Sequence, residues 1–434
     1  MKKIAMISDH ASPLAKIGSI NDGGQNIYVK NIAKKMGQRG YQVDIFTRRD
    51  NPALKSSVFL SPRVRVIHVP AGPPNYVEKE KLLPYMNEFT DFMTDYIYKN
   101  GIYDFIHANF FMSGLVAMKL KDYFRIPFFI TFHALGRVRR HFQRSEDKFS
   151  DIRFSIEDDI VSAADGIIAE CPQDKQDLID YYSADHSKIV VIPCGVDFSE
   201  LHPIDQRKAR GCLGLQDDEK IILQLGRLVP RKGIETIIHS LKILHKKYHT
   251  SARLLIVGGS TKRPDPVETP EIDRLGKIAR DAGLFDKVIF CGRASREEIK
   301  IYYNAADVFV TTPWYEPFGI TPLEAMACQK PVIGSRVGGL QFTIQHGRTG
   351  FLVPPRDPYS LAESIKELFA NPKLGKIFGR NGRQRVKKNF TWETVVDALD
   401  QSINKRLNHS VYVMKPEQGP SFLINKKIFS IEEV

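Results

Sequence analysis

Two glutamates flank a turn between an apolar strand and a helix in PWYEPFGITPLEAMA, residues 313–327. Glu316 and Glu324 are separated by seven residues, and the pattern between them predicts a helix that starts near Gly319. The first turn of a helix has unpaired N–H groups and the positive end of the helix dipole, so it can bind phosphate. The flanking carboxylates can accept hydrogen bonds from sugar hydroxyls. Taken alone, the pattern also fits a capped helix with solvent-facing glutamates.

Two cations follow another apolar strand in QLGRLVPRKGIETI, residues 224–237. Arg227 and Lys232 lie in the loop between this strand and the next helix. A pair of cations at the end of a sheet suits a diphosphate, because Arg binds two oxygens through its fork and Lys supplies a point charge. A solvated basic loop is the alternative for this segment taken in isolation.

A histidine and a run of arginines follow a third apolar strand in TFHALGRVRRHFQR, residues 131–144. His133 comes just past the strand, where ligand groups gather in parallel sheets, although a single histidine is more often structural. The arginines behind it have no acid among them, so we expect a concentrated anion site; they are Arg137, Arg139, Arg140 and Arg144. Arg153 either adds to this site or pairs with Glu157.

A fourth loop, SINDGGQNIYV at residues 19–29, contains a pair of glycines between an apolar strand and a helix. Gly23 and Gly24 lack the G-x-G-x-x-G spacing of a self-contained dinucleotide site. We therefore expect this loop to form half of a phosphate site, with the basic loop of the second half of the chain opposite it.

Apolar segments rich in β-branched residues alternate with amphipathic helical patterns along the chain, which predicts parallel sheets with helices on both faces. The segments form two sets, at 3–8, 42–47, 64–69, 103–108, 127–132, 166–170 and 188–193, and at 220–226, 252–259, 287–292, 307–312, 330–335 and 350–354. We expect two doubly wound, Rossmann-like α/β domains facing one cleft, with ligands at the carboxyl ends of the strands.

A polar stretch at residues 194–219 separates the two sets of strands. We accordingly assign residues 1–200 to the first domain and 201–385 to the second. Residues 386–410 form one more amphipathic helix, expected to pack back on the first domain, and residues 411–434 form an extension.

The chain of 434 residues carries a net charge of +13. This excess of positive charge favours anionic ligands such as nucleotides and sugar phosphates. Nucleic acid is not an expected partner, because basic tracts with interleaved aromatics are missing, whereas peripheral contact with a membrane is a minor expectation. No apolar run reaches the ~18 residues of a membrane span. The five scattered cysteines include no C-x-x-C pair, which fits a reducing cytoplasm.

Together these stretches resemble the retaining glycosyltransferases of family 4, which have the GT-B fold, over nearly the whole chain. They are most similar to the branch with the sucrose-phosphate synthases, whose relatives include mannosylfructose-phosphate synthase and glycosyltransferases acting on inositol phosphate. The motifs that carry the resemblance are HASPL (10–14), DGGQNIYV (22–29), DIFTRRD (44–50), TFHALGR (131–137), AECPQD (169–174), IPCGVD (192–197), GRLVPRKG (226–233) and EPFGITPLEAMAC (316–328).

The resemblance implies that a hexose moves from a UDP-, ADP- or GDP-sugar to a hydroxyl of a phosphorylated acceptor such as fructose 6-phosphate. Arg227 and Lys232 would hold the leaving diphosphate. Glu316 would contact the donor sugar, His133 would lie near the reacting carbon, and Glu324 would bind ribose. The other positions expected on the donor side are Gly23, Gly24, Arg293, Phe318, Gly319, Ile320 and Thr321.

On the acceptor side, the resemblance implies a phosphate site at positions that match the inositol-phosphate enzymes, namely Lys79, Arg139 and Arg153. Gln25 and Asn26 would face the acceptor hydroxyls.

The chain departs from its relatives at three positions on the acceptor side. Phe110 stands where relatives often carry Tyr, Ala134 where the inositol-phosphate type tends to carry Thr, and Gln25 where that type carries Met. These differences favour an acceptor like that of the sucrose-phosphate synthases.

No Asp-x-Asp motif occurs in the chain, so we expect transfer without a metal ion and without a cofactor other than the co-substrate. Retention is expected through front-side attack, in which the leaving phosphate helps to remove the acceptor proton. The alternatives are a peripheral-membrane transferase acting on a lipid or polysaccharide, an inositol-phosphate glycosyltransferase, and a catalytically silent nucleotide-sugar sensor. An epimerase on a related fold has no support in the motifs.

Overall fold

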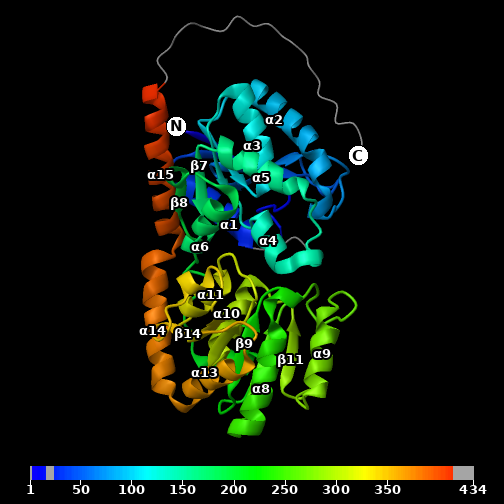
Figure 1. Ribbon diagram of the computed structural model, residues 1–434, viewed down its shortest axis with the longest axis vertical. Helices are drawn as coiled ribbons and strands as arrows, with labels where there is room; N and C mark the ends of the chain where they lie inside the picture. The colour runs from blue at the N-terminus through cyan, green and yellow to red at the C-terminus, as the bar shows by residue number, and fades with distance from the viewer. Residues whose placement is uncertain (1, 16–23, 414–434) are drawn as a thin grey trace, which may run out of the picture.

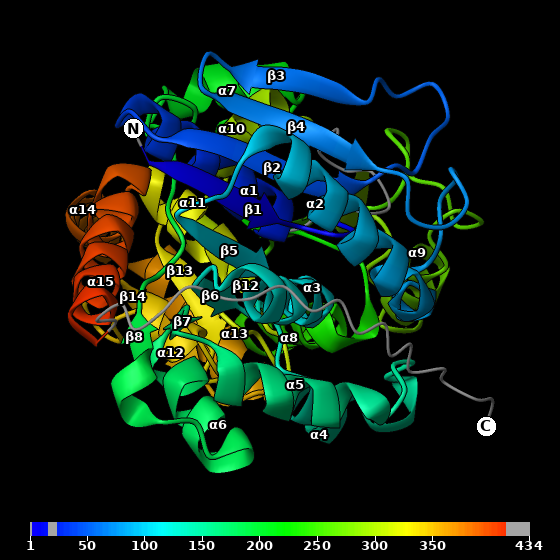
Figure 2. The ribbon, with the colours of Figure 1, turned by 90° about the horizontal axis from the view of Figure 1, so that it is seen from above.

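The computed structural model describes residues 2–15 and 24–413, which fold around two β-sheets (Figure 1). The first sheet has the order β3-β4-β2-β1-β5-β6-β7-β8, and all neighbours are parallel except β3 and β4 (Figure 2). Its strands are β1 (Lys3–Ile7), β2 (Gln42–Arg48), β3 (Ser57–Ser61), β4 (Val64–Val69), β5 (Phe105–Asn109), β6 (Phe128–Thr131), β7 (Gly166–Ala169) and β8 (Ile189–Val191).

The second sheet is parallel throughout and has the order β11-β10-β9-β12-β13-β14. Its strands are β9 (Ile221–Leu225), β10 (Arg253–Val257), β11 (Val288–Gly292), β12 (Val308–Thr311), β13 (Val332–Ser335) and β14 (Gly350–Val353). In both sheets the order reverses at the first strand of the unit, so the expectation of two doubly wound α/β units is confirmed.

Helices follow the strands in both units. Those of the first unit are α1 (Gly24–Gln38), α2 (Met86–Asn100), α3 (Phe111–Phe124), α4 (Gly136–Gln143), α5 (Ile152–Ala163) and α6 (Pro172–Tyr182). The others are α7 (Gln206–Cys212), α8 (Ile234–Tyr248), α9 (Glu271–Asp281), α10 (Arg296–Ala305), α11 (Ile320–Ala327), α12 (Leu340–Thr343), α13 (Pro358–Ala370), α14 (Pro372–Asn389) and α15 (Trp392–Val413).

The edge strand β3 and the helix α7 were not predicted from the sequence. β3 is an edge strand whose residues are partly or fully exposed, so it lacks the buried apolar run that marks the other strands. α7 lies inside the polar stretch 194–219 and packs against α10, where the guanidinium of its Arg210 pairs with Asp307 at 2.9 Å. Tertiary contacts rather than an apolar stripe hold this short helix in place.

The alternation of side chains along β1 shows why both faces of the first sheet are covered. Ile4 and Met6 join a core cluster with α1, whereas Ala5 and Ile7 join a second cluster with α2 and α3. Successive residues of a strand point to opposite faces, so a strand that is apolar at every position must be buried on both.

The chain crosses between the two units at two adjacent places. Val196 donates its backbone N–H to the carbonyl of Phe390 at 2.7 Å, and it forms a parallel bridge with Thr391. A Cβ at Gly195 would lie 2.6 Å from the ring of Trp392, so only glycine allows this close approach. Trp392 belongs to a core cluster that continues from one unit into the other.

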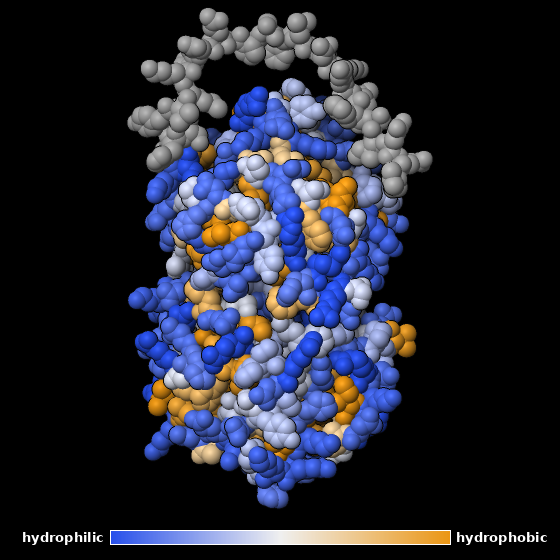
Figure 3. Space-filling model, in the orientation of Figure 1, coloured by the Kyte–Doolittle hydropathy of each residue, from blue (hydrophilic) through white to orange (hydrophobic). Residues whose placement is uncertain are grey.

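Figure 1 shows α14 beside the second unit and α15 beside the first. α15 packs on α1, and ion pairs reinforce the contact: Lys35 with Glu393 at 2.5 Å and Arg39 with Asp397 at 2.5 Å. Among the helices described, none has the length and apolar character that crossing a membrane requires. On the face drawn in Figure 3, hydrophobic residues lie in small groups between hydrophilic ones.

Candidate active site

Lys232 and Glu316 meet because the strands before them are neighbours. β9 leads into the loop with Lys232, and β12, which lies next to β9, leads into the loop with Glu316. The two side chains form an ion pair and are only 15% and 14% exposed. Burial works to raise the pKa of Glu316, but Lys232, Arg231 and Arg227 outweigh it and hold this pKa below its usual value. A charged carboxylate therefore stands among three cations.

The start of α11 faces the start of α1 across the boundary between the units. Gly319 caps α11 with a φ of 91°, and no side chain caps the N–H groups of Ile320 and Thr321. A Cβ added to Gly24 at the start of α1 would lie 3.1 Å from the Ile320 side chain. Phe318, the residue before this cap, is buried. Gly23 lies outside the described residues.

Glu324 is held by two groups that the sequence did not single out. Its carboxylate accepts a hydrogen bond from the Tyr303 hydroxyl at 2.9 Å and pairs with Arg296. Arg296 also pairs with Glu200 at 2.7 Å. A cation at the first position of a helix opposes the helix dipole, and this mismatch is the signal by which Arg296 could have been found.

The predicted base-side residue Arg293 follows β11 and is tied to a neighbouring loop. Its backbone N–H donates to the carbonyl of Thr261 at 2.8 Å. Gly292 before it has a φ of 74°, and a Cβ there would lie 2.3 Å from the carbonyl of Lys262. The loop after β10 and the end of β11 are thus in close contact, as neighbouring strand ends should be.

In the first unit, His133 follows β6 with a backbone φ of 58°, a left-handed conformation that a non-glycine residue rarely adopts. Its Nδ1 lies 3.2 Å from Glu170 Oε1, and its Nε2 lies 3.1 Å from Asn109 Oδ1. Neither partner was predicted. Both are polar residues at the carboxyl end of an apolar strand, which is the signal that could have found them.

Gln25 and Asn26 use their amide groups within the protein. Gln25 Nε2 donates to Ser8 Oγ and to the carbonyl of Asn109, both at 3.2 Å. Asn26 is buried, and its Nδ2 donates to the carbonyl of Ser12 at 2.9 Å. These contacts fix the start of α1 against the end of the sheet; the proposed contact with an acceptor stays a prediction.

Lys79 begins a short 3₁₀ helix and stands near cations of both units. Burial, together with the positive charges of Arg139, Arg227 and Arg153, lowers the pKa of Lys79 to about 8, while Glu80 opposes this shift. Within the described residues, no carboxylate forms an ion pair with Lys79. A lysine that is repelled by nearby arginines and has no paired carboxylate is suited to binding an anion.

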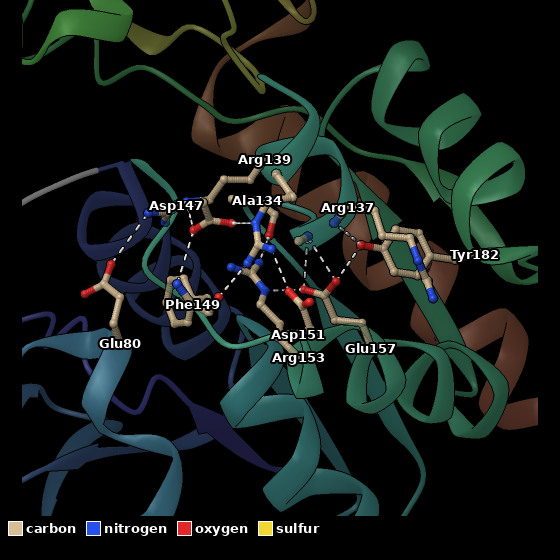
Figure 4. A network of polar contacts seen from close by, with 12 residues as sticks. Glu80, Ala134, Arg137, Arg139, Asp147, Phe149, Asp151, Arg153, Glu157 and Tyr182 are labelled. Atoms are coloured by element: carbon tan, nitrogen blue, oxygen red, sulfur yellow. Dashed lines mark hydrogen bonds and ion pairs between the residues drawn. The ribbon is translucent and has the colours of Figure 1, made fainter. Parts of the chain in front are cut away.

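The expectation of un-neutralised arginines on α4 is wrong. Arg137 pairs with Asp158 at 2.5 Å, and Arg140 pairs with Asp151 at 2.6 Å. Arg139 contacts Asp147 at 2.9 Å and the more distant Glu80 at 3.6 Å (Figure 4). The three aspartates come from the turn and helix that follow, which fold back on α4, whereas Glu80 comes from the 3₁₀ helix that begins at Lys79. Of these three, only Arg139 influences Lys79 enough to lower its pKa.

Arg153 pairs with Glu157, as one of the two expectations for it stated. It is 1% exposed, its Nε lies 2.7 Å from Glu157, and its Nη2 donates to the carbonyl of Ala134 at 2.5 Å (Figure 4). Its guanidinium lies 5.0 Å from the ring centroid of Phe110 and 4.7 Å from that of Phe149. Nη1 finds no partner among the described residues.

Glu157 also accepts hydrogen bonds from the Gly136 N–H at 3.0 Å and the Tyr182 hydroxyl at 2.5 Å. Replacing Glu157 with alanine would leave Arg153 as a buried, unpaired charge. We expect the free energy of unfolding in urea to fall by about 3–5 kcal/mol. The same change at the exposed Glu146 should cost less than about 0.5 kcal/mol. Equal losses in both variants would show that the buried pair is not stabilising.

Two family models match the chain in succession. The model described as Glycosyltransferase Family 4 matches residues 22–200, and the model described as Glycosyl transferases group 1 matches residues 205–385. The D-inositol 3-phosphate glycosyltransferase 2 of Catenulispora acidiphila is 32% identical over 403 residues, which cover 92% of this chain and 93% of that protein. The chain belongs to glycosyltransferase family 4. Family 4 membership makes it a hexosyltransferase, as predicted.

Solved structures agree with the GT-B fold of family 4. The sucrose-phosphate synthase of Thermosynechococcus elongatus is 36% identical, with a TM-score of 0.86 over 94% of this chain and 100% of that chain. HepE of Anabaena, solved in complex with UDP and glucose, is 20% identical, with a TM-score of 0.71 over 93% of this chain and 100% of that chain. At that identity the HepE match concerns the fold alone.

Proposed function

We propose that this family 4 enzyme transfers a hexose from a nucleotide sugar to a hydroxyl of a phosphorylated acceptor such as fructose 6-phosphate, with retention of the anomeric configuration. The observation that carries the proposal is the meeting of cations from both units. The positive charge of Arg227, in the second unit, lowers the pKa of Lys79, in the first. Lys232, in the same loop as Arg227, forms an ion pair with Glu316. A donor diphosphate and an acceptor phosphate would be bound side by side there.

The donor side has the groups that departure of a diphosphate needs. Negative charge grows on the leaving oxygen while the sugar becomes positive, so cations and oriented N–H groups lower the barrier. Arg227, Lys232 and the uncapped start of α11 would supply them, with Glu316 placed to hold the sugar. The HepE structure with UDP and glucose is in line with a nucleotide-sugar donor on this fold.

The acceptor side favours a sugar phosphate over an inositol phosphate. Phe110 offers no side-chain hydroxyl where relatives often carry Tyr, and Ala134 offers none where the inositol-phosphate type tends to carry Thr. In the structure the Phe110 ring packs on Arg153, and Ala134 binds Arg153 through its carbonyl oxygen. Curated relatives include the inositol-phosphate enzymes, so this acceptor is the second candidate.

The test is a transfer assay with purified protein, each of UDP-, ADP- and GDP-hexose, and three acceptors: fructose 6-phosphate, inositol 3-phosphate and unphosphorylated fructose. We expect product with one nucleotide sugar and fructose 6-phosphate, at a rate at least about 100-fold above that with fructose. Product with inositol 3-phosphate alone would favour the second candidate. Equal rates with fructose and its phosphate would contradict a phosphate site.

We also propose that transfer needs no divalent metal, because the chain has no Asp-x-Asp motif to bridge a metal to the diphosphate. Assays in excess EDTA should retain more than about half of the rate, since the charge stabilisation comes from protein cations. Restoration of a lost rate by added Mg²⁺ or Mn²⁺ would refute this.

The alternative of a peripheral-membrane enzyme is tested by sedimentation of the same protein with anionic vesicles. Sedimentation with the vesicles would favour this alternative, and failure to sediment would count against it.

A further inference from the structure

His133 is clamped at both ring nitrogens because its strand lies between two others. β6 has β5 on one side and β7 on the other, so Asn109 and Glu170 stand at the strand ends that flank it. The Nδ1–Oε1 distance to Glu170 is 3.2 Å and the Nε2–Oδ1 distance to Asn109 is 3.1 Å. The His133 and Glu170 side chains are 9% and 6% exposed.

Both partners of the ring are acceptors. Asn109 Nδ2 lies 3.3 Å from the carbonyls of Ile7 and His107, so the amide nitrogen donates there and the amide oxygen faces His133. Burial works to raise the pKa of Glu170, but His133 and the Cys194 thiol outweigh it and lower this pKa, so the side chain is a carboxylate. A ring that donates from both nitrogens is an imidazolium.

We propose that Glu170 is a positioning residue that holds His133 as an imidazolium in one orientation at the donor site. The kinetic part of the proposal rests on the proposed transferase function. The negative charge of Glu316 acts to raise the pKa of Glu170, so the His133–Glu170 pair lies close to the Lys232–Glu316 pair of the other unit. A fixed cation there adds to the positive potential at a leaving diphosphate.

The other titratable groups around the ring are uncharged near neutral pH. The Tyr28 ring meets His133 edge-on at 4.9 Å, and burial raises the pKa of its hydroxyl. Burial lowers the pKa of His107 to about 3 and raises that of Cys194, whose thiol donates to Glu170 at 2.9 Å. Within this shell Glu170 supplies the balancing charge for the imidazolium.

The charge state can be tested without any substrate. In ¹⁵N-histidine-labelled enzyme at pH 7.5, with the signal assigned through His133→Gln, both ring nitrogens of His133 should carry protons. In Glu170→Gln, the ring should show the neutral pattern with one protonated nitrogen. A neutral ring in the unchanged protein, or an imidazolium that persists in Glu170→Gln, would overturn the proposal. This result does not depend on which sugar the enzyme transfers.

The kinetic readout separates positioning from a structural role. Glu170→Gln should lower kcat about 10- to 100-fold, leave the donor KM within about threefold, and move the basic limb of the pH–kcat profile by at least about one unit toward acid. The limb moves to lower pH because loss of the carboxylate disfavours the charged ring. An unchanged pH profile in a folded Glu170→Gln protein would contradict the positioning role.

Asp174 offers a matched control four residues along the chain. It is a partly buried carboxyl that accepts a hydrogen bond from the Glu170 N–H at 2.9 Å, and within the described residues it forms no hydrogen bond or ion pair with His133. Burial and the charge of Glu170 raise the pKa of Asp174 to about 8, so it is mostly protonated at neutral pH and asparagine imitates it. Asp174→Asn should keep the kcat and the pH profile.

Discussion

Replacing Lys232 with alanine is expected to lower kcat by about 10²- to 10³-fold, the largest effect we foresee for a single substitution. Removal of one preorganised charge at a developing anion commonly costs this much. Lys232 is buried against Glu316 and needs no reorganisation to act. The measurement is single-turnover transfer with saturating donor. Lys246→Ala, at the exposed far end of the helix that follows, should keep the full rate.

Lys232→Ala also leaves the Glu316 carboxylate buried without its ion-pair partner, which can destabilise the fold. A loss of stability must therefore be distinguished from a loss of catalysis. The double variant Lys232→Ala/Glu316→Gln removes the unpaired charge and should recover most of the melting temperature. We expect it to stay inactive, because neither the cation nor the carboxylate that we propose binds the sugar is restored. Activity recovered together with stability would contradict a direct role of Lys232 in transfer.

Replacing Lys79 with alanine is expected to lower kcat/KM for the phosphorylated acceptor by about 10²-fold and to leave hydrolysis of the donor unchanged. The reason is the loss of a half-buried cation that stands beside Arg139 and Arg227. Lys81→Ala is the matched control, because Lys81 is 72% exposed in the same 3₁₀ helix and pairs with Glu78. Equal losses in the two variants would show that general surface charge binds the acceptor.

The same residue predicts a pH dependence with a definite sign. Lys79, with a pKa of about 8, is charged below that pH and loses its charge as the pH rises through it. Since kcat/KM reports the free enzyme, its value for the phosphorylated acceptor should decline above about pH 8. In Lys79→Arg this decline should disappear, because arginine keeps its charge. A decline that persists in Lys79→Arg would assign it to another group.

The strands and the start of α11 could be predicted because each follows from a local pattern. Buried parallel strands are continuous apolar runs, and the glycine before Ile320 marks a helix start. The strand β3 was not predicted, because an exposed edge strand has no continuous apolar run. The positions of Lys232 and Glu316 were also local, since both follow strand ends.

The partners within the site could not be predicted, because they depend on strand order and on chain segments that fold back. The pairing of Lys232 with Glu316 requires that β9 and β12 be neighbours. The neutralisation of Arg137 by Asp158 requires the turn after α4 to reverse the chain. Spacing along the sequence contains neither fact.

The return of α15 to the first unit has a consequence for synthesis on the ribosome. The cluster that contains Ile32 and Met36 of α1 is completed by Trp392, Val396 and Leu399, which are made some 360 residues later. An N-terminal domain usually folds first as it emerges. Here the face of α1 that packs on α15 stays uncovered until almost the whole chain has been made. A chain arrested before residue 392 should therefore expose this face to chaperones, although the strands of the second sheet have all been synthesised.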